Sequence, residues 1–336
     1  MAKLRTAIIG CGRVSTVYKR AFEDLADLAE PVFAVDKVPE RAGDFAASFG
    51  AGHSDSLEDL LAVKPDLVHI CTPHFLHKDQ ALACLKGGTN VLCEKPMAIT
   101  LAGADAMIET AKQTGKHLGI IFQNRYIRGI VELKKFIEAG GLGKLKGAFS
   151  NLNWHRPPSY YQCDWKGSWE KEGGGVLIDQ AIHSIDLVRY LVDSPVKSVN
   201  GHIDTRILTS IEVEDCASAA IEFHNGVIYS LFACNYYQEN APIQIEIAGE
   251  KGTAHFDGST VTITTGDVKR VIPPDASPDN RGENYWGRAH AIQIKTCYEA
   301  CLTGSTFPVA PEEARATLAL VLGVYESSRQ GRKLLF

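Results

Sequence analysis

Short apolar runs alternate with amphipathic stretches through the first third of this 336-residue chain, and this alternation limits its fold more than any other feature. The apolar runs, typical of buried strands, are residues 4–9, 32–35, 67–71, 91–93 and 118–122. The stretches between them have helical spacing: residues 15–28, 39–49, 56–63, 75–86 and 101–114. Strands rich in Val, Ile and Leu that are separated by helices predict a parallel sheet covered on both faces. Right-handed crossovers then give a doubly wound (Rossmann) α/β domain with ligands at the carboxyl ends of its strands.

The pattern changes after about Gln123. Helical spacing at residues 129–139 and 173–192 is followed by alternating strands at residues 196–204, 217–224, 227–235, 243–248 and 260–265, and helices at 290–302 and 312–329 close the chain. Asn225-Gly226 between two of these strands is a strong hairpin signal. The sequence therefore predicts an α+β domain with a large, mainly antiparallel open β-sheet. We expect a dinucleotide-binding domain at residues 1–123 and a substrate and oligomerisation domain at 124–336. The C-terminal helix of the second domain can pack back on the first domain. The sequence "PPDASPDNRGEN" at residues 273–284 is typical of a loop.

Composition excludes several classes of protein. Apolar residues make up 45% of the chain, and the net charge of −5 is mixed along it, without the clustered Lys and Arg of a nucleic-acid or membrane-surface protein. The nine cysteines have no paired spacing, and His74 and His77 have no third partner at a recognisable spacing, so no metal site is expected. Without an apolar run of ~18 residues or a secretory h-region, we expect a cytoplasmic protein that uses no membrane.

A glycine loop follows the first predicted strand directly. In "AIIGCGRVS", Gly10 permits a tight turn, and Gly12 lets backbone N–H groups approach a pyrophosphate at the start of the next helix. Arg13 and Val14 belong to the same loop. The third fingerprint position is Ser15 instead of Gly or Ala. An ordinary strand–helix turn would explain the two glycines alone, but their place at the first βα unit favours a cofactor.

Asp36 ends the second predicted strand, where a carboxylate binds the adenosine ribose hydroxyls and repels a 2′-phosphate. An Asp that only caps the following turn is the alternative. Together with the glycine loop, Asp36 predicts NAD as the cofactor, while the adjacent Lys37 leaves NADP possible.

Ionisable residues lie where acid/base chemistry beside a nicotinamide would need them. "EKP" (Glu94, Lys95, Pro96) follows the strand at 91–93, and Thr72-Pro73 ends the previous strand. Asp179 and His183 are spaced i, i+4 on one predicted helix and so share a face. A lysine, an aspartate and a histidine suit the oxidation of an alcohol.

The chain resembles the glucose–fructose oxidoreductase/inositol dehydrogenase (Gfo/Idh/MocA) family of NAD(P)-dependent oxidoreductases over nearly its whole length. The matching pieces are Gly10-Cys11-Gly12, Cys71-Thr72-Pro73 with His77, Glu94-Lys95-Pro96, "QNRY" at 123–126, the helix at 173–187 and "IEIAGEKGTAHFDG" at 245–258.

The resemblance implies roles for individual residues. Lys95 would hydrogen-bond the reacting oxygen, His183 would be the general acid/base, and Asp179 would orient them or balance their charge. Asp186 is expected to be structural. The residues expected to contact the cofactor are Gly10, Gly12, Arg13, Val14, Asp36, Thr72, Pro73, His77, Glu94 and Lys95.

An aromatic segment, "WHRPPSYYQCDWKGSWEKEGGG" (154–175), resembles the branch that oxidises nucleotide-linked sugars, notably UDP-N-acetylglucosaminuronate 3-dehydrogenases. Aromatic rings stack on sugars or uracil, and an arginine binds acidic groups. The expected substrate-binding residues are Arg125, Arg156, Tyr160, Tyr161 and Trp165. Packing of this segment within its own domain or across a subunit interface is an equal alternative. An acid at Asp179 is instead typical of cyclitol dehydrogenases, so the sequence mixes features of both branches.

Three functions remain open. The chain fits an NAD(P)-dependent dehydrogenase acting on a secondary hydroxyl of a sugar, sugar nucleotide or cyclitol. The alternatives are an NAD-dependent glycosidase that oxidises its sugar transiently and a non-catalytic NAD-binding regulator of the same fold. An open sheet face usually needs covering, so we expect a homodimer or homotetramer.

Overall fold

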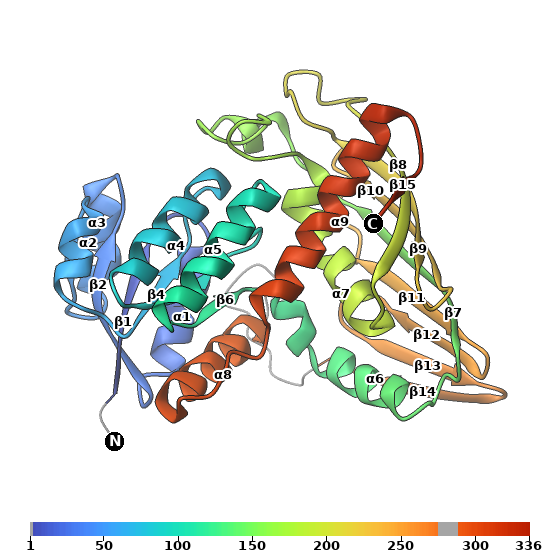
Figure 1. Cartoon of the computed structure of the whole chain (residues 1–336), viewed down its shortest axis with the longest axis horizontal. Helices are drawn as coiled ribbons and strands as arrows, with labels where there is room; N and C mark the ends of the chain where they lie inside the picture. Colours follow the sequence, from blue (N-terminus) through green and yellow to red (C-terminus); the bar gives the residue numbers. More distant parts are fainter. Residues whose placement is uncertain (1–2, 275–287) are drawn as a thin grey trace. The chain divides into compact units, whose positions relative to one another are not determined.

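A computed structural model describes residues 3–274 and 288–336, and these fold into two compact units (Figure 1). The first unit contains the chain up to Gln123 together with a later segment that ends at Arg315, and the second contains the chain from Asn124 together with Ala316–Phe336. The division predicted from the sequence also falls after residue 123, but it assigned all of residues 124–336 to one domain. The predicted loop at 273–284 lies, beyond residue 274, outside the described residues.

The first unit is built on a parallel sheet. Its described strands are β1 (Leu4–Ile9), β2 (Ala29–Val35), β3 (Gly52–Ser54), β4 (Leu67–Ile70), β5 (Asn90–Cys93) and β6 (Leu118–Ile120). They are ordered β3-β2-β1-β4-β5-β6 and all pair in parallel. This is the doubly wound order, in which the direction of winding reverses between β1 and β4. Both predictions, the parallel sheet and its doubly wound form, are confirmed.

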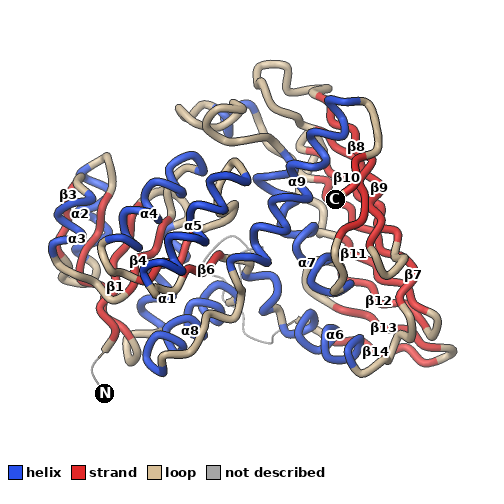
Figure 2. Tube along the Cα trace, in the orientation of Figure 1, coloured by secondary structure: helices blue, strands red, loops and turns tan. Residues whose placement is uncertain are grey.

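Helices cover the sheet of the first unit (Figure 2). They are α1 (Ser15–Asp24), α2 (Pro39–Ala47), α3 (Leu57–Ala62), α4 (His77–Lys86, after a 3₁₀ turn at His74–Leu76), α5 (Leu101–Thr114) and α8 (Ala289–Thr303). Helix α5 shows how local sequence sets a boundary. The Thr100 hydroxyl accepts a hydrogen bond from the Gly103 N–H at 3.1 Å, and Gly115 ends the helix at φ +66°.

Helix α8 belongs to the core of the first unit although it is far away in the sequence. Its Ile294 and Tyr298 pack with Ile8 and Leu92 of the sheet in one hydrophobic cluster. The Tyr298 hydroxyl lies 2.8 Å from Nε2 of the buried His69 on β4. The chain therefore returns to complete the core of the first unit between two segments of the second unit.

The second unit is built on a larger sheet. Its described strands are β7 (Leu145–Asn153), β8 (Val196–Asp204), β9 (Cys216–Phe223), β10 (Ile228–Cys234), β11 (Gln244–Gly249), β12 (Gly252–Phe256), β13 (Val261–Thr265), β14 (Val268–Ile272) and β15 (Leu334–Leu335). Their order is β14-β13-β12-β11-β7-β10-β9-β8-β15, and all described pairs are antiparallel except β7 with β10. The mainly antiparallel sheet is confirmed. Asn225-Gly226 forms the predicted hairpin turn between β9 and β10, with Gly226 at φ +89°.

Helices lie along one face of this second sheet (Figures 1 and 2). They are α6 (Arg128–Glu138), α7 (Ile182–Val192) and, from Ala316 onward, α9 (Pro311–Gln330); short turns of 3₁₀ helix at Gln123–Tyr126 and Pro158–Tyr161 and a π-helical turn at Leu177–Ala181 complete the described elements. None of the helices in the described part of the chain is long and apolar enough to cross a membrane.

Candidate active site

The glycine loop follows β1, next to the point where the winding of the sheet reverses. Gly10 has φ +93°, and a Cβ at this position would lie 2.7 Å from the carbonyl carbon and oxygen of Cys71. Any side chain would therefore strain the backbone and collide with the end of β4. The Gly10 N–H also donates to the Val35 carbonyl at 2.8 Å, which ties the loop to β2. Gly10 is thus required by the fold of the loop itself.

Gly12 is different, because nothing lies within 4 Å of a Cβ built there. The space above it is open, as a pyrophosphate that approaches backbone N–H groups requires. Ser15, at the third fingerprint position, is buried and its hydroxyl donates to the Gly12 carbonyl at 2.6 Å, so the serine closes the turn from inside. Arg13 is exposed and Val14 half-buried. The loop fits a bound dinucleotide.

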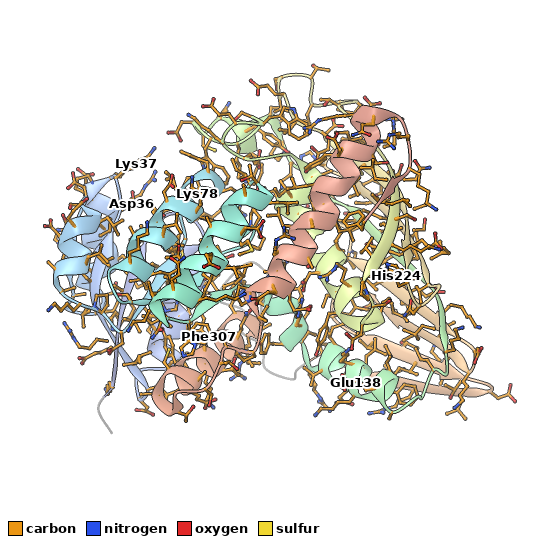
Figure 3. All side chains as sticks on the ribbon, in the orientation of Figure 1. Asp36, Lys37, Lys78, Glu138, His224 and Phe307 are labelled. Atoms are coloured by element: carbon orange, nitrogen blue, oxygen red, sulfur yellow. The ribbon has the colours of Figure 1, made fainter. Side chains whose placement is uncertain are left out.

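Asp36 lies beyond the end of β2, beside the exposed Lys37 (Figure 3). One carboxylate oxygen of Asp36 accepts the Cys11 N–H at 2.7 Å, and the other accepts the Val38 N–H at 2.9 Å. Each carboxylate oxygen accepts more than one hydrogen bond, so both keep capacity for ribose hydroxyls. The side chain therefore links the glycine loop to the second strand while remaining able to bind a ribose.

The loop after β4 is joined to the loop after β5 by His77. The His77 ring nitrogens lie 2.7 Å from the Pro96 carbonyl oxygen and 2.8 Å from the Thr72 carbonyl oxygen. Burial lowers the pKa of His77, so the ring is neutral and donates to one of the two carbonyls at a time. Thr72 in turn donates to the Gln80 side chain at 2.5 Å. His77 therefore contacts backbone and holds the shape of two loops.

Glu94 is buried in the first unit. Its carboxylate accepts the Tyr18 hydroxyl at 2.8 Å and lies 3.5 Å from Nε2 of His290 on α8. Burial opposes ionisation of Glu94, but His290, Lys95 and Tyr18 outweigh it and lower the pKa to about 2. An ionised, anchored Glu94 fixes the backbone that carries Lys95. Lys95 itself is half-buried, and its bond to Pro96 is cis.

In the second unit, three glycines precede the helix that carries Asp179 and His183. A Cβ on Gly174 would overlap the Tyr325 hydroxyl, and one on Gly175 would overlap the Glu214 carbonyl oxygen. The buried Glu214 carboxylate accepts the Gly175 N–H at 2.8 Å and the Leu177 N–H at 3.0 Å, so it caps the start of the helix. The glycines are needed for this close packing.

Asp179 is buried, and one of its carboxylate oxygens, Oδ2, accepts three donors. They are the Lys166 ammonium at 2.5 Å, the Gln180 amide at 2.6 Å and the Tyr160 hydroxyl at 2.8 Å. Asp179 lies in the π-helical turn, and the half-buried His183 follows four residues later in α7. Single π turns within helices are frequent at functional sites.

The network extends from Asp179 to Asn235, the residue that follows β10. The Asn235 amide donates to the Gln180 carbonyl oxygen and to the Tyr161 hydroxyl, both at 3.0 Å. Burial raises the pKa of Tyr160 to about 12, so both its hydroxyl proton and its donor role are retained at neutral pH. The hydroxyl groups of Tyr160 and Tyr161 are thus held by hydrogen bonds to Asp179 and Asn235, respectively.

Arg156 is 8% exposed and stacks between two rings, 4.7 Å from Trp154 and 5.1 Å from Tyr160. Its Nη1 donates to the His155 carbonyl at 2.7 Å and to Asn240 at 3.0 Å. Its Nε is buried without a hydrogen-bond partner, and Arg156 forms no ion pair with a carboxylate among residues 3–274 and 288–336. Arg156 is therefore a buried cation without an ion-pair partner in the described part of the chain.

Arg125, by contrast, has a carboxylate partner. Its guanidinium donates to both oxygens of Asp186, at 2.7 and 2.6 Å, and both side chains are buried. The Thr317 hydroxyl also donates to Asp186, at 3.0 Å. This bidentate pair ties the start of the second unit to α7 and α9.

Several residues of the second-unit network were not predicted from the sequence, among them Lys166, Glu172 and Glu214. Lys166 and Glu172 lie within the aromatic segment, where Lys166 directly follows Trp165, and a cation among aromatic residues was the available signal. Glu214 lies in a stretch without periodicity, and nothing in the sequence marked it.

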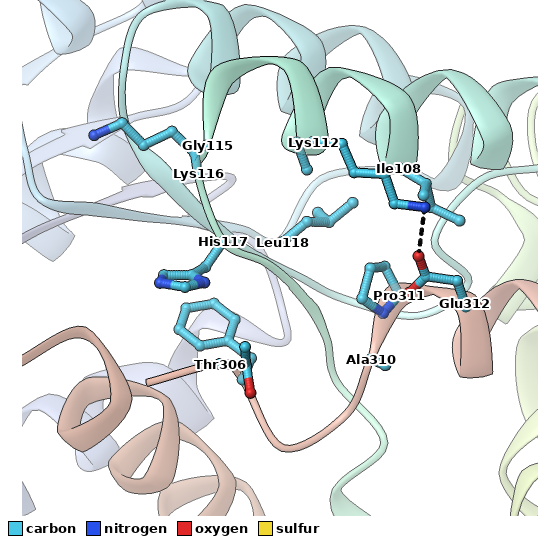
Figure 4. Close-up of a pocket in the computed structure, with 12 residues that line it drawn as sticks. Ile108, Lys112, Gly115, Lys116, His117, Leu118, Thr306, Ala310, Pro311 and Glu312 are labelled. Carbon is cyan, nitrogen blue, oxygen red and sulfur yellow. Dashed lines mark ion pairs between the residues drawn. The ribbon is translucent and has the colours of Figure 1, made fainter. Parts of the chain in front are cut away.

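A hollow of about 450 Å³ lies elsewhere on the first unit, between the end of α5, β6 and residues 306–312. Lys112 and Glu312 form an ion pair of 2.9 Å across it (Figure 4), and the His117 ring faces Phe307 with 5.1 Å between centroids. Its lining includes none of the residues predicted to bind cofactor or substrate.

Two family models match the chain. One, described as an oxidoreductase family with an NAD-binding Rossmann fold, covers residues 4–122, and the other, the GFO/IDH/MocA C-terminal domain, covers residues 130–255. The chain belongs to the GFO/IDH/MocA oxidoreductase family. Members similar to it include a D-glucoside 3-dehydrogenase of Escherichia coli (strain K12), 32% identical over 304 residues, which are 83% of this chain and 84% of that protein. A myo-inositol 2-dehydrogenase of Thermotoga maritima is 25% identical, and the match covers 98% of each chain.

Solved structures agree with this assignment. The WlbA dehydrogenase from Bordetella pertussis, in complex with NADH and UDP-GlcNAcA, is 30% identical with a TM-score of 0.86, covering 100% of this chain and 99% of that one. A levoglucosan dehydrogenase has a TM-score of 0.90 at 22% identity, covering 99% of each chain, and shows the shared fold. This GFO/IDH/MocA protein is therefore an NAD(P)-dependent oxidoreductase, and the comparisons do not favour the glycosidase or regulator alternatives.

Proposed function

We propose that the protein is an NAD-dependent dehydrogenase that oxidises a secondary hydroxyl of a sugar or sugar derivative. The observation that carries this proposal is the set of donors that converges on Asp179, four residues before the half-buried His183. Buried carboxylates with fixed partners beside a histidine are typical of acid/base sites. The D-glucoside 3-dehydrogenase similar to this chain is named for a sugar substrate, and the similar WlbA dehydrogenase is in complex with UDP-GlcNAcA, which supports the same class of substrate.

The proposed mechanism separates the two hydrogens of a carbinol. When bound, the nicotinamide cofactor supplies the acceptor for the hydride that leaves the carbinol carbon. The hydroxyl proton passes to the neutral imidazole of His183, because histidine is the side chain that most readily exchanges a proton near neutral pH. Lys95, as an ammonium, hydrogen-bonds the same oxygen and stabilises alkoxide character as the carbonyl forms. Asp179 balances the positive charge that His183 acquires.

Gly10, Gly12, Arg13, Val14, Thr72 and Pro73 are proposed to form the cofactor site, and Asp36 to select NAD. Asp36 supports this proposal because its two oxygens are already held in place by the Cys11 and Val38 N–H groups. A carboxylate that is fixed in advance loses little conformational freedom when it binds a ribose. His77 and Glu94 are proposed to shape the two loops of this site through the contacts described above.

Arg156 favours a second candidate, oxidation of an acidic sugar such as a uronate or a sugar nucleotide. A buried guanidinium without a carboxylate partner is costly, and an anionic substrate group would offset that cost. Tyr160, Tyr161 and Trp165 are proposed to line the same substrate region, and Arg125 to support it through Asp186. If Arg156 binds a carboxylate or phosphate, Arg156→Met should lower kcat/KM for an acidic substrate far more than for a neutral glycoside.

The test of the proposed function is an NADH-absorbance screen with NAD and purified protein. The panel contains neutral glycosides, free aldoses, inositols, uronates, and UDP-sugars with and without a uronate carboxylate. Reduction of NAD with one of these classes, and formation of one keto product per NADH, supports the proposal. Release of a free sugar without net NADH formation would contradict it and favour a glycosidase.

We also propose a homodimer or homotetramer formed through the sheet face opposite α6 and α7. Phe149 on β7 is 40% exposed and Ile228 on β10 is 51% exposed, and their strand register places both on one face. Light scattering should give two or four times the 36.6 kDa chain mass, and Phe149→Glu should reduce it. All nine cysteines are free, six of them buried, which supports the cytoplasm as the compartment; fractionation of the source cells tests this.

A further inference from the structure

Lys166 is a buried cation with a defined set of neighbours in the second unit. Its side chain is 10% exposed, which is rare for lysine. Its Nζ lies 2.5 Å from Asp179 and 3.2 Å from Glu172, and it faces the rings of Tyr160 at 4.5 Å and Trp165 at 4.2 Å. The two rings shield the ion pairs from water, so the electrostatic interactions are strong.

The site around Lys166 holds one more negative charge than positive charge when all three groups are ionised. Glu172 is anchored by the Gly167 N–H at 2.5 Å, yet burial raises its pKa to about 8. Burial also opposes the charge of Lys166, but Asp179, Tyr160 and Glu172 outweigh it and raise the pKa of Lys166 well above its usual value. Near neutral pH, Glu172 therefore takes up a proton, and Lys166 remains paired with Asp179.

We propose that Lys166 is a positioning residue of the active site, which keeps Asp179 ionised and fixes its carboxylate through Oδ2. This inference rests on the proposed dehydrogenase function, in which Asp179 balances the charge of His183. Lys166 itself touches neither the reacting atoms nor the cofactor in this account and acts through Asp179. Tyr160 and Gln180 donate to the same oxygen, but Lys166 is the one of these three donors that brings a positive charge.

The consequence is a dependence on pH. The ionisable groups that face Asp179 within the second unit are Lys166, Tyr160, Tyr161 and Glu172, with Arg156 beyond Tyr160 and His183 later on the same helix. Removal of the one adjacent cation leaves Asp179 next to Glu172. The Asp179 carboxyl should then take up its proton at a pH about 1–3 units higher. Because kcat/KM needs both an ionised Asp179 and a neutral His183, the acid limb of kcat/KM should move upward in a variant that lacks this cation.

The first experiment measures pH profiles of kcat/KM for Lys166→Met, Lys166→Gln and Lys166→Arg. Lys166→Gln keeps a donor for Asp179 but removes the charge, and it replaces Lys166→Met if that variant fails to fold. Both neutral variants should shift the acid limb upward, and Lys166→Arg should not. Lys171→Met is the matched control, because Lys171 lies in the same segment and donates to the Asp164 backbone carbonyl at 2.8 Å. A neutral variant with an unshifted limb but lower thermal stability would overturn the proposal.

A second measurement does not need turnover, so it separates this inference from the proposed function. Carboxyl-carbon NMR of protein labelled with ¹³C-Asp follows the Asp179 titration directly, with Asp179→Asn to assign the signal. The midpoint should rise by about 1–3 pH units in Lys166→Gln. An unchanged midpoint would overturn the role of Lys166 even if the enzyme oxidises sugars. A shifted midpoint in a protein that oxidises no sugar would support Lys166 and refute the proposed function.

Discussion

Gly10 and Gly12 stand two residues apart in one motif, but the structure predicts that alanine lowers stability at Gly10 and not at Gly12. Gly10→Ala places a side chain at φ +93° and within 2.7–2.9 Å of backbone atoms of Cys71 and Thr72. A residue in such a backbone conformation costs roughly 1–3 kcal/mol. Overpacking against rigid backbone costs about 1–3 kcal/mol more. Together these lower the unfolding temperature by on the order of 5–20 °C.

Gly12→Ala meets no atom within 4 Å and needs no unusual backbone angle. The stability of the cofactor-free protein should therefore change by less than about 0.5 kcal/mol. Its methyl group instead occupies the space in which backbone N–H groups approach the pyrophosphate. We expect the Kd for NADH to rise at least about tenfold, which is ~1.4 kcal/mol.

The assay pairs thermal unfolding of the cofactor-free protein with a fluorescence titration of NADH for the parent and both variants. Gly10→Ala should lose stability and NADH affinity together, and Gly12→Ala should lose affinity alone. If Gly12→Ala binds NADH as tightly as the parent, the cofactor does not approach Gly12. If Gly10→Ala is as stable as the parent, the reasoning from its backbone angle and contacts is wrong.

Three further predictions concern cofactor choice, substrate geometry and pH. Asp36→Ser combined with Lys37→Arg should move the ratio of catalytic efficiencies toward NADP, and a parent that already prefers NADP would refute the role of Asp36. Tyr160→Phe removes one donor to Asp179, so kcat/KM should fall by about 10- to 100-fold while NADH affinity is unchanged. An unaltered kcat/KM would show that the Tyr160 hydroxyl is not needed for the reaction. Burial raises the pKa of Glu214 to about 7 from 4.5, so the folded state holds this proton to higher pH than the unfolded state. Parent stability should therefore fall between about pH 4.5 and 7, less so in Glu214→Gln, and parallel stability profiles would contradict this.

Much of the fold was predictable because hydrophobic periodicity reports burial directly. The strand at residues 4–9 and the helix at 101–114 agree with β1 and α5, since one is buried on nearly all sides and the other has a cap at each end. Strand β3 was missed because Gly52–Ser54 contains no large apolar residue and is held by its pairing with β2. Strands β7, β12 and β14 were also missed. Strand β7 pairs with strands that are distant in sequence, β12 is a short strand in a hairpin with β11, and β14 is exposed at four of its five residues and shows no hydrophobic alternation.

The candidate site was predictable where a motif marks it and not where tertiary packing makes it. Gly10 and Asp36 follow strands, so their position could be inferred from the strand order. Lys166 contacts Asp179, 13 positions later in the chain, and Glu214 contacts Gly175, 39 positions earlier. These contacts form only when the chain folds, so the sequence alone does not reveal them. The sequence also leaves undecided whether Arg156 packs or binds an anion, because both uses need the same residue beside aromatic rings.

The central claim is that Lys95 and His183 carry out acid/base chemistry on a substrate hydroxyl while NAD accepts the hydride. The most direct test measures kcat and NADH affinity in parallel for the parent, Lys95→Ala, Lys95→Arg and His183→Ala, with the best substrate of the screen. Removal of a positioned acid or base typically costs ~10² to 10⁴ in rate. Both alanine variants should lose kcat in that range and still bind NADH, and Lys95→Arg should not recover, because a planar guanidinium does not replace a compact ammonium. Full activity in either alanine variant would contradict the account, and loss of NADH binding in Lys95→Ala would assign Lys95 to the cofactor instead.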